Sequence, residues 1–402
     1  MSWWTYFSGR QQQSINEDNF SKAYTEDRIR VFNYGAGAGV DRCPFSIVNF
    51  MHFRLDTKFI LGMLDAEEKK DYLRYWYCYV MDCLTHLMKF VSLSALEGLS
   101  AMRIISGKEE GAGVGKILHM DYDMVKNSNA TLVNADVLHS FAVVDLRDSP
   151  MTITLPEKEP MPSNPNGVRY LSAQIVSEEH YYPVQVKTKP GKHVVTEEMM
   201  ESRYCLITFR TQVNPASEDD MILGEELRKR ILLEQDTKPK NILLSEWNRK
   251  EILKFQQRIW KESPNFKPIY GKRGELTLAE HNYSTSMFCG LPPDEGIYFE
   301  VRSKYSLQTQ TLTLKDVPVN SFWALTVYRS HYKLSDSANN SSVIRNEDGS
   351  VTLWFGTSCP KCAPKTNFLE IFDGWKGFLR LYSPTEKCHN GEWVCPSFEL
   401  VQ

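Results

Sequence analysis

The hydrophobic pattern of this chain changes its period along the sequence. Around residues 70–90, apolar side chains recur every three or four positions, which places them on one face of a helix. These positions are Leu73, Trp76, Val80, Cys83, Leu87 and Phe90. From about residue 117 the apolar residues come in short runs between turn residues, as in 140–146 and 151–155, and such runs are typical of strands. We therefore predict an N-terminal helical region over residues 1–116 and a first β domain over residues 117–216.

A second helical pattern follows the first β region. Ser217 and Asp220 have the spacing of a helix N-cap and its capping partner, and apolar residues then recur at helical spacing. The pattern ends before Pro264, because the residue before a proline is disfavoured in a helix. We predict a helical connector over residues 217–264.

The last third of the chain returns to strand patterns. The runs 351–355 and 378–382 are rich in β-branched and aromatic residues, and Asp348 with Gly349 supplies the backbone conformation of a tight turn. Strands that recur between turns, without helical patterns, favour a sandwich or a jelly roll. We expect a C-terminal β-sandwich over residues 265–402. The whole chain is predicted to be mainly β (α+β), with two β-sandwich or jelly-roll-like domains, an N-terminal helical layer and a helical connector.

Composition narrows the class of protein without changing this fold. The 402 residues can form two or three cores, and 42% of them are apolar. The formal net charge of −3 provides no basic field for nucleic acid or an anionic membrane. No stretch approaches the roughly 20 apolar residues that span a bilayer, and the N-terminus lacks the features of a secretory signal. We expect a soluble cytoplasmic protein without nucleic-acid or membrane partners, and homo-oligomerisation stays open.

Two glycine-rich runs have the wrong spacing for nucleotide binding. The run at 35–40 lacks the third glycine of the dinucleotide-binding motif. The run at 111–117 has Glu110 where a phosphate loop needs glycine, and Ile117 where it needs serine or threonine. The glycines are more consistent with turns, and we expect no cofactor.

Four of the nine cysteines lie near the C-terminus. Cys359 and Cys362 form a C-x-x-C pair, and Cys388 and Cys395 flank a turn signal. Such a set can bind zinc or form a disulfide across the turn. The spacing matches no zinc-finger pattern, and a reducing compartment keeps thiols free. Free thiols and no bound metal are therefore the favoured interpretation, while zinc and a disulfide stay open as alternatives.

Five motifs of the C-terminal region occur in a fixed order. They are SFWALTVY at 321–328, NEDGSVTLW at 346–354, NFL at 367–369, GFLRLYSP at 377–384 and GEWVCP at 391–396. Together they resemble the family called domain of unknown function 1214. The resemblance implies a fold and a kinship, but it names no reaction.

A second set of motifs lies in the first β region. They are NADVLHS at 134–140, DL at 145–146, SPMTITLP at 149–156 and RYLSAQ at 169–174. This set resembles the family called domain of unknown function 1254, which normally precedes the first family in tandem. Tyrosine generally stands there at the position of His139. The resemblance therefore argues against an obligatory proton-transfer role for His139, or it indicates a diverged activity.

Asn134, Asp136 and His139 form a polar cluster within this second set. Side chains alternate along an extended chain, so Asn134 and Asp136 can point the same way. Asp136 can hold His139 or a substrate hydroxyl, and His139 can exchange protons near neutral pH. We name Asp136 and His139 as candidate catalytic residues and Asn134 as a candidate ligand-binding residue. The alternative is structural, because Asn and Asp cap turns by bonding their own backbone.

Five further residues are candidate ligand-binding residues. Arg380 lies in mid-strand among apolar neighbours, where its charge needs either a structural partner or an anionic ligand. The others carry aromatic or amide groups that bind sugars but also fill cores: Tyr170, Gln174, Trp323 and Tyr328. The expected function is a small-molecule or carbohydrate site at the interface of two β domains, with hydrolase or lyase activity as one form of it. The alternative is a non-catalytic β-sandwich for binding or structural assembly, and whether the protein is an enzyme stays open.

Overall fold

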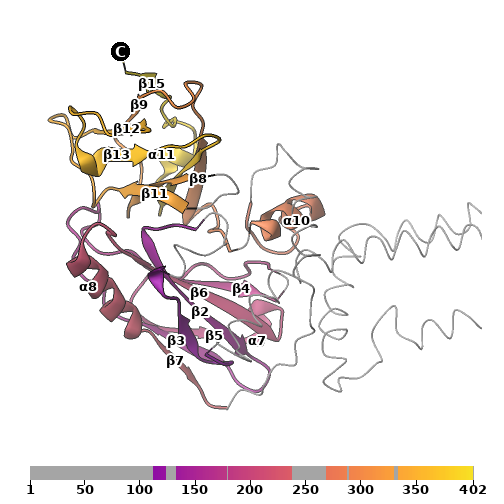
Figure 1. Ribbon diagram of the computed structural model, residues 1–402. Helices are drawn as coiled ribbons and strands as arrows, with labels where there is room; N and C mark the ends of the chain where they lie inside the picture. Colours follow the sequence, from indigo (N-terminus) through magenta and orange to yellow (C-terminus); the bar gives the residue numbers. More distant parts are fainter. Residues whose placement is uncertain are drawn as a thin grey trace, which may run out of the picture.

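The computed structural model describes residues 112–123, 133–178, 180–237, 269–287, 289–329 and 334–401. This part of the chain is mainly β, as predicted, with several antiparallel sheets and few helices. Its strands form two sheet pairs, which lie one above the other in Figure 1. Most of the predicted N-terminal helical region lies outside the described residues, and so does the predicted connector beyond residue 237.

The first sheet pair combines a four-stranded and a three-stranded antiparallel sheet. Their strand orders are β1-β2-β6-β4 and β5-β3-β7. The strands are β1 Ile117–His119, β2 Val137–Asp145, β3 Met151–Leu155, β4 Leu171–Ser177, β5 Gly191–Val195, β6 Tyr204–Gln212 and β7 Leu232–Gln235. Apolar side chains of both sheets meet in one core, to which the helices α7 (Glu197–Met200) and α8 (Glu218–Lys229) also contribute.

The second sheet pair combines two four-stranded sheets. Their strand orders are β11-β10-β14-β8 and β13-β12-β9-β15, and β12 runs parallel to β13. The strands are β8 Gly296–Val301, β9 Gln310–Leu314, β10 Trp323–Tyr328, β11 Leu334–Asn339, β12 Val351–Gly356, β13 Phe368–Glu370, β14 Lys376–Tyr382 and β15 Glu399–Leu400. Short helices are α10 Leu278–Ser286, η4 Lys365–Asn367 and α11 Glu386–His389. Apolar side chains from both sheets share one core, as in a β-sandwich.

The two sheet pairs meet through the outer faces of two sheets. Because side chains alternate along a strand, β6 turns Arg210 away from the first core and β14 turns Arg380 away from the second. The contacts between these faces include the Tyr170 ring, whose centroid lies 5.2 Å from that of Tyr382. Val137 belongs to the same buried cluster. We call this region, between sheet β1-β2-β6-β4 and sheet β11-β10-β14-β8, the seam.

Three local predictions have specific outcomes. The predicted helix start is confirmed, because Ser217 Oγ caps α8 by accepting the N–H of Asp220 at 3.3 Å. Residues 232–235, predicted within a helical connector, form strand β7 instead, because they pair with β3 and extend the sheet over the first core. The turn at Asp348 and Gly349 is present, with Gly349 at φ 80°. The strand after that turn pairs with β9, however, and not with the strand before the turn.

Candidate functional site

Seven of the eight candidate residues lie at the seam. They are Asn134, Asp136, His139, Tyr170, Gln174, Tyr328 and Arg380. The eighth, Trp323, lies in β10 with its side chain in the core of the second sheet pair. The fold therefore brings together residues from both motif sets, and it directs Trp323 away from them.

Asn134 and Asp136 bind the second sheet pair directly. Asn134 Nδ2 donates to the hydroxyl of Tyr382 at 2.5 Å, and Asn339 Nδ2 donates to Asp136 Oδ1 at 2.6 Å. Asn134 Oδ1 also accepts the N–H of Asp136 at 3.0 Å, which is the local turn bond of the structural interpretation. Both side chains are buried. This segment therefore leads into β2 and also links it to the facing sheet.

The carboxyl group of Asp136 is fully buried and incompletely bonded. Its Oδ2 has no hydrogen-bond partner among the described residues. Burial raises the pKa of Asp136 to about 6, while the bond from Asn339 and the charge of Arg380 act in the opposite direction. Such a carboxyl changes its charge near neutral pH, which is a property common among functional carboxyls.

Arg380 projects from β14 into the seam. Its Nη1 donates to Thr326 Oγ1 at 2.9 Å, and its Nη2 donates to the hydroxyl of Tyr328 at 2.5 Å. These bonds offset part of the cost of burying its charge. The same charge lowers the pKa values of Asp136 and His139, so one guanidinium acts on both candidate catalytic residues.

His139 on β2 differs from these neighbours because its ring forms no hydrogen bond to any described residue. The side chain keeps some solvent-exposed surface and stacks on Phe141, with ring centroids 6.2 Å apart. The surrounding protein, together with the charges of Arg210 and Arg380, lowers the pKa of His139 to about 3. At neutral pH the imidazole is therefore uncharged, with one N–H donor and one acceptor nitrogen.

Arg210 was missed by sequence reasoning, although it lies directly opposite His139 on β6. Its Nη1 donates to Gln174 Oε1 at 2.5 Å, and its Nη2 donates to the carbonyl of Cys289. The signal that points to Arg380, a charge in the middle of a buried strand, is equally present at Arg210. A search of the sequence for charged residues in the middle of apolar strands therefore finds both arginines of the seam.

Tyr170 lies among aromatic residues at the seam. Its hydroxyl donates to Glu295 Oε2 at 3.3 Å, and Ser383 Oγ donates to the same oxygen at 3.2 Å. The Tyr170 ring also contacts the ring of Phe322, at 5.6 Å between centroids. Burial raises the pKa values of both Tyr170 and Glu295. The phenol is therefore uncharged at neutral pH and acts here as a packed hydrogen-bond donor.

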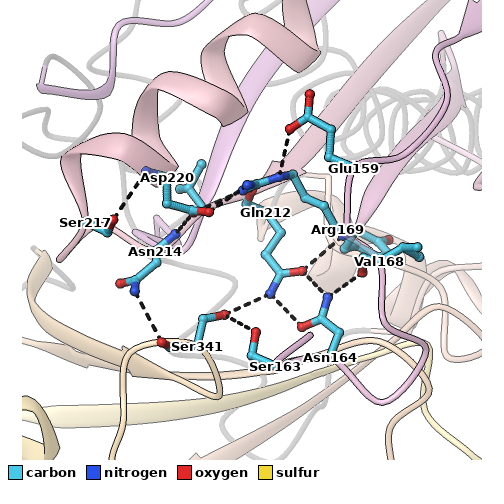
Figure 2. A network of polar contacts seen from close by, with 12 residues as sticks. Glu159, Ser163, Asn164, Val168, Arg169, Gln212, Asn214, Ser217, Asp220 and Ser341 are labelled. Atoms are coloured by element: carbon cyan, nitrogen blue, oxygen red, sulfur yellow. Dashed lines mark hydrogen bonds and ion pairs between the residues drawn. The ribbon is translucent and has the colours of Figure 1, made fainter. Parts of the chain in front are cut away.

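A polar network joins the two sheet pairs at one edge of the seam (Figure 2). Arg169 donates to both carboxylate oxygens of Asp220, at 2.6 and 3.0 Å, and to the carbonyl of Gln212 at 2.8 Å. Asp220 Oδ2 also accepts the N–H of Asn214 at 2.6 Å. Asn214 Nδ2 in turn donates to the carbonyl of Ser341, beyond β11, at 3.3 Å. This network ties the start of α8 to the second sheet pair.

The four C-terminal cysteines are free thiols. Cys359 and Cys362 are exposed, while Cys388 and Cys395 are partly buried. In the part of the chain that the structure describes, no group of three His, Cys, Asp or Glu residues is placed to hold a metal ion. The described helices include none long and apolar enough to cross a bilayer.

Comparison with known proteins gives a kinship but no activity. The family described as "Protein of unknown function (DUF1214)" matches residues 290–386, a segment that includes Arg380. No match supports the resemblance of the first β region to domain of unknown function 1254. None of the curated proteins matches this chain.

Among the solved structures that match this chain are two bacterial proteins. The VPA0106 protein of Vibrio parahaemolyticus is 15% identical, with a TM-score of 0.52, and the similarity covers 67% of this chain and 90% of that one. A putative uncharacterized protein from Burkholderia cenocepacia is 14% identical, with a TM-score of 0.44, over 79% of this chain and 89% of that one. At this identity, the similarity to the Vibrio protein shows a shared fold alone.

Proposed function

We propose that this protein binds a small polar molecule in the seam, and that its two sheet pairs act as two domains that both contribute to this site. The observation that carries the proposal is the His139 ring, which keeps exposed surface and has a donor and an acceptor without partners among the described residues. Asn134, Gln174 and Arg380, which also lie at the seam, are by contrast buried and hydrogen-bonded. A ligand at such a ring gains hydrogen bonds without breaking any within the protein.

The electrostatics of the seam support binding more strongly than proton transfer. With a pKa of about 3, His139 is a weak base at neutral pH, whereas general-base catalysis works best when the pKa lies near the working pH. Asp136 has a pKa of about 6, but its carboxyl is fully buried and bonded to Asn339. We therefore assign ligand binding to His139 and a positioning role to Asp136. No hydrolase or lyase step follows from these residues.

A purely structural role of the seam is the second candidate function. It is favoured by the bonds of the buried polar side chains: Gln174 Nε2 donates to the carbonyl of Gly290 at 2.6 Å, and Arg380 bonds Thr326 and Tyr328. If the seam only joins the two sheet pairs, substitutions in it lower the stability of the protein. In that case no small molecule stabilises the wild type through His139.

Thermal unfolding of the full chain separates the two candidates. The screen uses a panel of monosaccharides, small organic acids and inorganic anions, with the wild type, His139→Leu and His389→Leu. His389 is an exposed histidine on α11, and its substitution is the matched control. We expect at least one compound to raise the Tm of the wild type and of His389→Leu, but not that of His139→Leu. A panel without any response, or a response that His139→Leu retains, contradicts the proposal.

A further inference from the structure

The outer face of sheet β1-β2-β6-β4 places several polar side chains in two neighbouring rows. His139 on β2 lies opposite Arg210 on β6, and Arg210 lies opposite Ser172 on β4. In the next row, Thr208 on β6 lies opposite Gln174 on β4. Residues two positions apart on a strand share a face, so all these side chains belong to the seam.

Arg210 carries a positive charge that is bonded to neutral groups. The residue is 6% exposed, and its two hydrogen bonds go to the amide oxygen of Gln174 and to the carbonyl of Cys289. Within the described residues it forms no ion pair. A guanidinium has five N–H donors, and a buried charge without a counter-charge is costly. An anion placed against Arg210 would remove this cost.

The hydroxyl groups beside Arg210 also lack partners. Thr208 Oγ1 and Ser172 Oγ are buried and form no hydrogen bond with any residue that the structure describes. Ser172 lies near enough to the Tyr170 hydroxyl to influence the pKa of Tyr170. Buried hydroxyls in proteins are normally hydrogen-bonded, and an unbonded one requires an explanation. Thr208 can donate to a ligand that occupies the seam beside Arg210.

His139 adds a donor to the same region, and Arg380 adds positive charge. The His139 ring has a nitrogen–hydrogen donor without a partner among the described residues. Arg380 projects from the facing sheet, and its positive charge acts on His139 together with that of Arg210. The groups that converge here are thus a guanidinium from each sheet, a hydroxyl and a neutral imidazole. This set offers hydrogen-bond donors and positive charge.

We propose that the seam binds the oxyanion group of a small molecule, a carboxylate, phosphate or sulfate, with Arg210 as its charge partner and Thr208 and His139 as donors beside it. Guanidinium and hydroxyl donors form strong charge-assisted bonds with such oxyanions. A neutral sugar would satisfy the hydroxyl and the imidazole but would leave the charge of Arg210 without compensation. This inference rests on the proposed function of the seam and names the chemical class of its ligand.

A bound oxyanion would reverse the field that acts on His139. The charges of Arg210, Arg380 and Arg228 now help to hold the pKa of His139 low. An anion at hydrogen-bond distance favours the charged imidazole, so binding raises the pKa of His139. A rise of about two units leaves this pKa at about 5, so proton uptake accompanies binding in mildly acidic solution, at about pH 5, and is small at neutral pH. A site that merely tolerates ions on its surface would not couple to His139 in this way.

Isothermal titration calorimetry with the full chain tests this inference. The probes are inorganic phosphate, sulfate and acetate, with glucose as the neutral probe, each in two buffers of different ionisation enthalpy. The variants are Arg210→Gln and Thr208→Val, and Arg345→Gln is the control because Arg345 is exposed and lies on the turn before β12. Thr208→Val keeps the shape of the side chain and removes an unbonded hydroxyl, so it should fold as well as the wild type.

In titrations at about pH 5, we expect at least one anion to bind the wild type and Arg345→Gln equally, with a buffer-dependent heat from proton uptake. Thr208→Val should weaken this binding about tenfold, the usual effect of losing one hydrogen bond to a charged group, and Arg210→Gln should abolish it. The anion that binds most tightly shows whether the ligand of the seam carries a carboxylate, a phosphate or a sulfate group. Equal affinity in wild type, Arg210→Gln and Thr208→Val overturns the inference.

The neutral probes separate this inference from the proposed function. If neutral compounds bind through His139 while phosphate, sulfate and acetate give no heat, the oxyanion inference fails and the proposed function stands. If neither anions nor neutral compounds bind, both fail.

Discussion

Asp136 Oδ1 accepts a 2.6 Å hydrogen bond from Asn339 Nδ2, although the two residues are 203 positions apart in the chain. Asp136 immediately precedes β2 of the first sheet pair, and Asn339 ends β11 of the second. Ser337 Oγ donates to the same oxygen at 3.4 Å. The segment with the most conspicuous polar motif is therefore also a point at which the two sheet pairs are joined. A substitution there affects folding as well as any ligand.

The stability of the wild type relative to Asp136→Asn should depend on pH. The folded protein raises the pKa of Asp136 from 3.8 to about 6, so the folded state holds a proton that the unfolded state releases. This stabilisation is present below about pH 4 and is lost as the pH rises through about 6. Asp136→Asn cannot titrate. We therefore expect the wild type to lose about 3 kcal/mol relative to the variant between about pH 4 and 7.

Urea unfolding of both proteins at several pH values measures this difference. Asp136→Ala is the companion variant, and it should be about 1–3 kcal/mol less stable than Asp136→Asn at every pH, because neither variant titrates at this position and alanine leaves the buried Asn339 amide without an acceptor. Stability curves of wild type and Asp136→Asn that stay parallel across this range would show that Asp136 has an ordinary pKa.

The titration of His139 should change the stability of the folded protein with pH in the opposite direction to that of Asp136. Its pKa is lowered from 6.5 to about 3, so the folded state holds the ring neutral where the unfolded state takes up a proton. This contribution is complete above about pH 6.5 and is lost as the pH falls toward about 3. We expect the wild type to lose stability relative to His139→Gln as the pH is lowered from about 6.5 to 4. Urea unfolding at several pH values measures this loss. A stability difference between wild type and His139→Gln that does not change with pH would show that the pKa of His139 is not lowered in the folded protein.

Breaking the ion pair between Arg169 and Asp220 should be strongly destabilising. Arg169 is buried and bonds both oxygens of Asp220 (Figure 2), and removing Asp220's charge leaves Arg169 with only its longer ion pair to Glu159, at 3.8 Å. We expect Asp220→Asn to lose about 3–5 kcal/mol in the free energy of unfolding. The control is Glu234→Gln, which breaks the exposed pair with Lys192 and should cost less than about 1 kcal/mol. Equal losses in the two variants would mean that the network contributes little.

The sequence predicts where the strands of this protein lie better than it predicts which strands pair and in which register. The runs at 351–355 and 378–382 form β12 and β14, because local alternation and β-branched or aromatic residues are sufficient to specify a strand. The face that a side chain takes depends on register, and a shift of one residue exchanges the two faces. Trp323 therefore lies in a core although its motif marks it as a candidate ligand-binding residue.

The contacts across the seam could not be predicted from the sequence, for a different reason. The bond between Asp136 and Asn339 forms only when two separate sheet pairs dock, and no local pattern encodes that docking. Arg210 was within reach, because a charge in mid-strand is visible in the sequence. Its position opposite His139, however, depends on the pairing of β2 with β6.

The cysteines should differ in reactivity according to burial. Cys359 and Cys362 are exposed, whereas Cys205 is fully buried and its pKa is raised by burial. Only the thiolate reacts with alkylating reagents. A short pulse of iodoacetamide, followed by peptide mass spectrometry, should label Cys359 and Cys362 in the native protein, and Cys205 only after denaturation. Native labelling of Cys205 at the rate of Cys359 would contradict the packing of β6.

The most direct test of ligand binding in the seam is an NMR titration of the histidine rings at about pH 5 with inorganic phosphate, sulfate and acetate in turn. The chain contains nine histidines, and the signals of His139 are assigned by their loss in His139→Leu. We predict that the His139 ring signals shift saturably toward the protonated form, that those of the exposed His389 do not, and that Arg210→Gln abolishes the shift. His139 signals that remain unchanged with all three anions, or that move no more than those of His389, would contradict an oxyanion site at the seam.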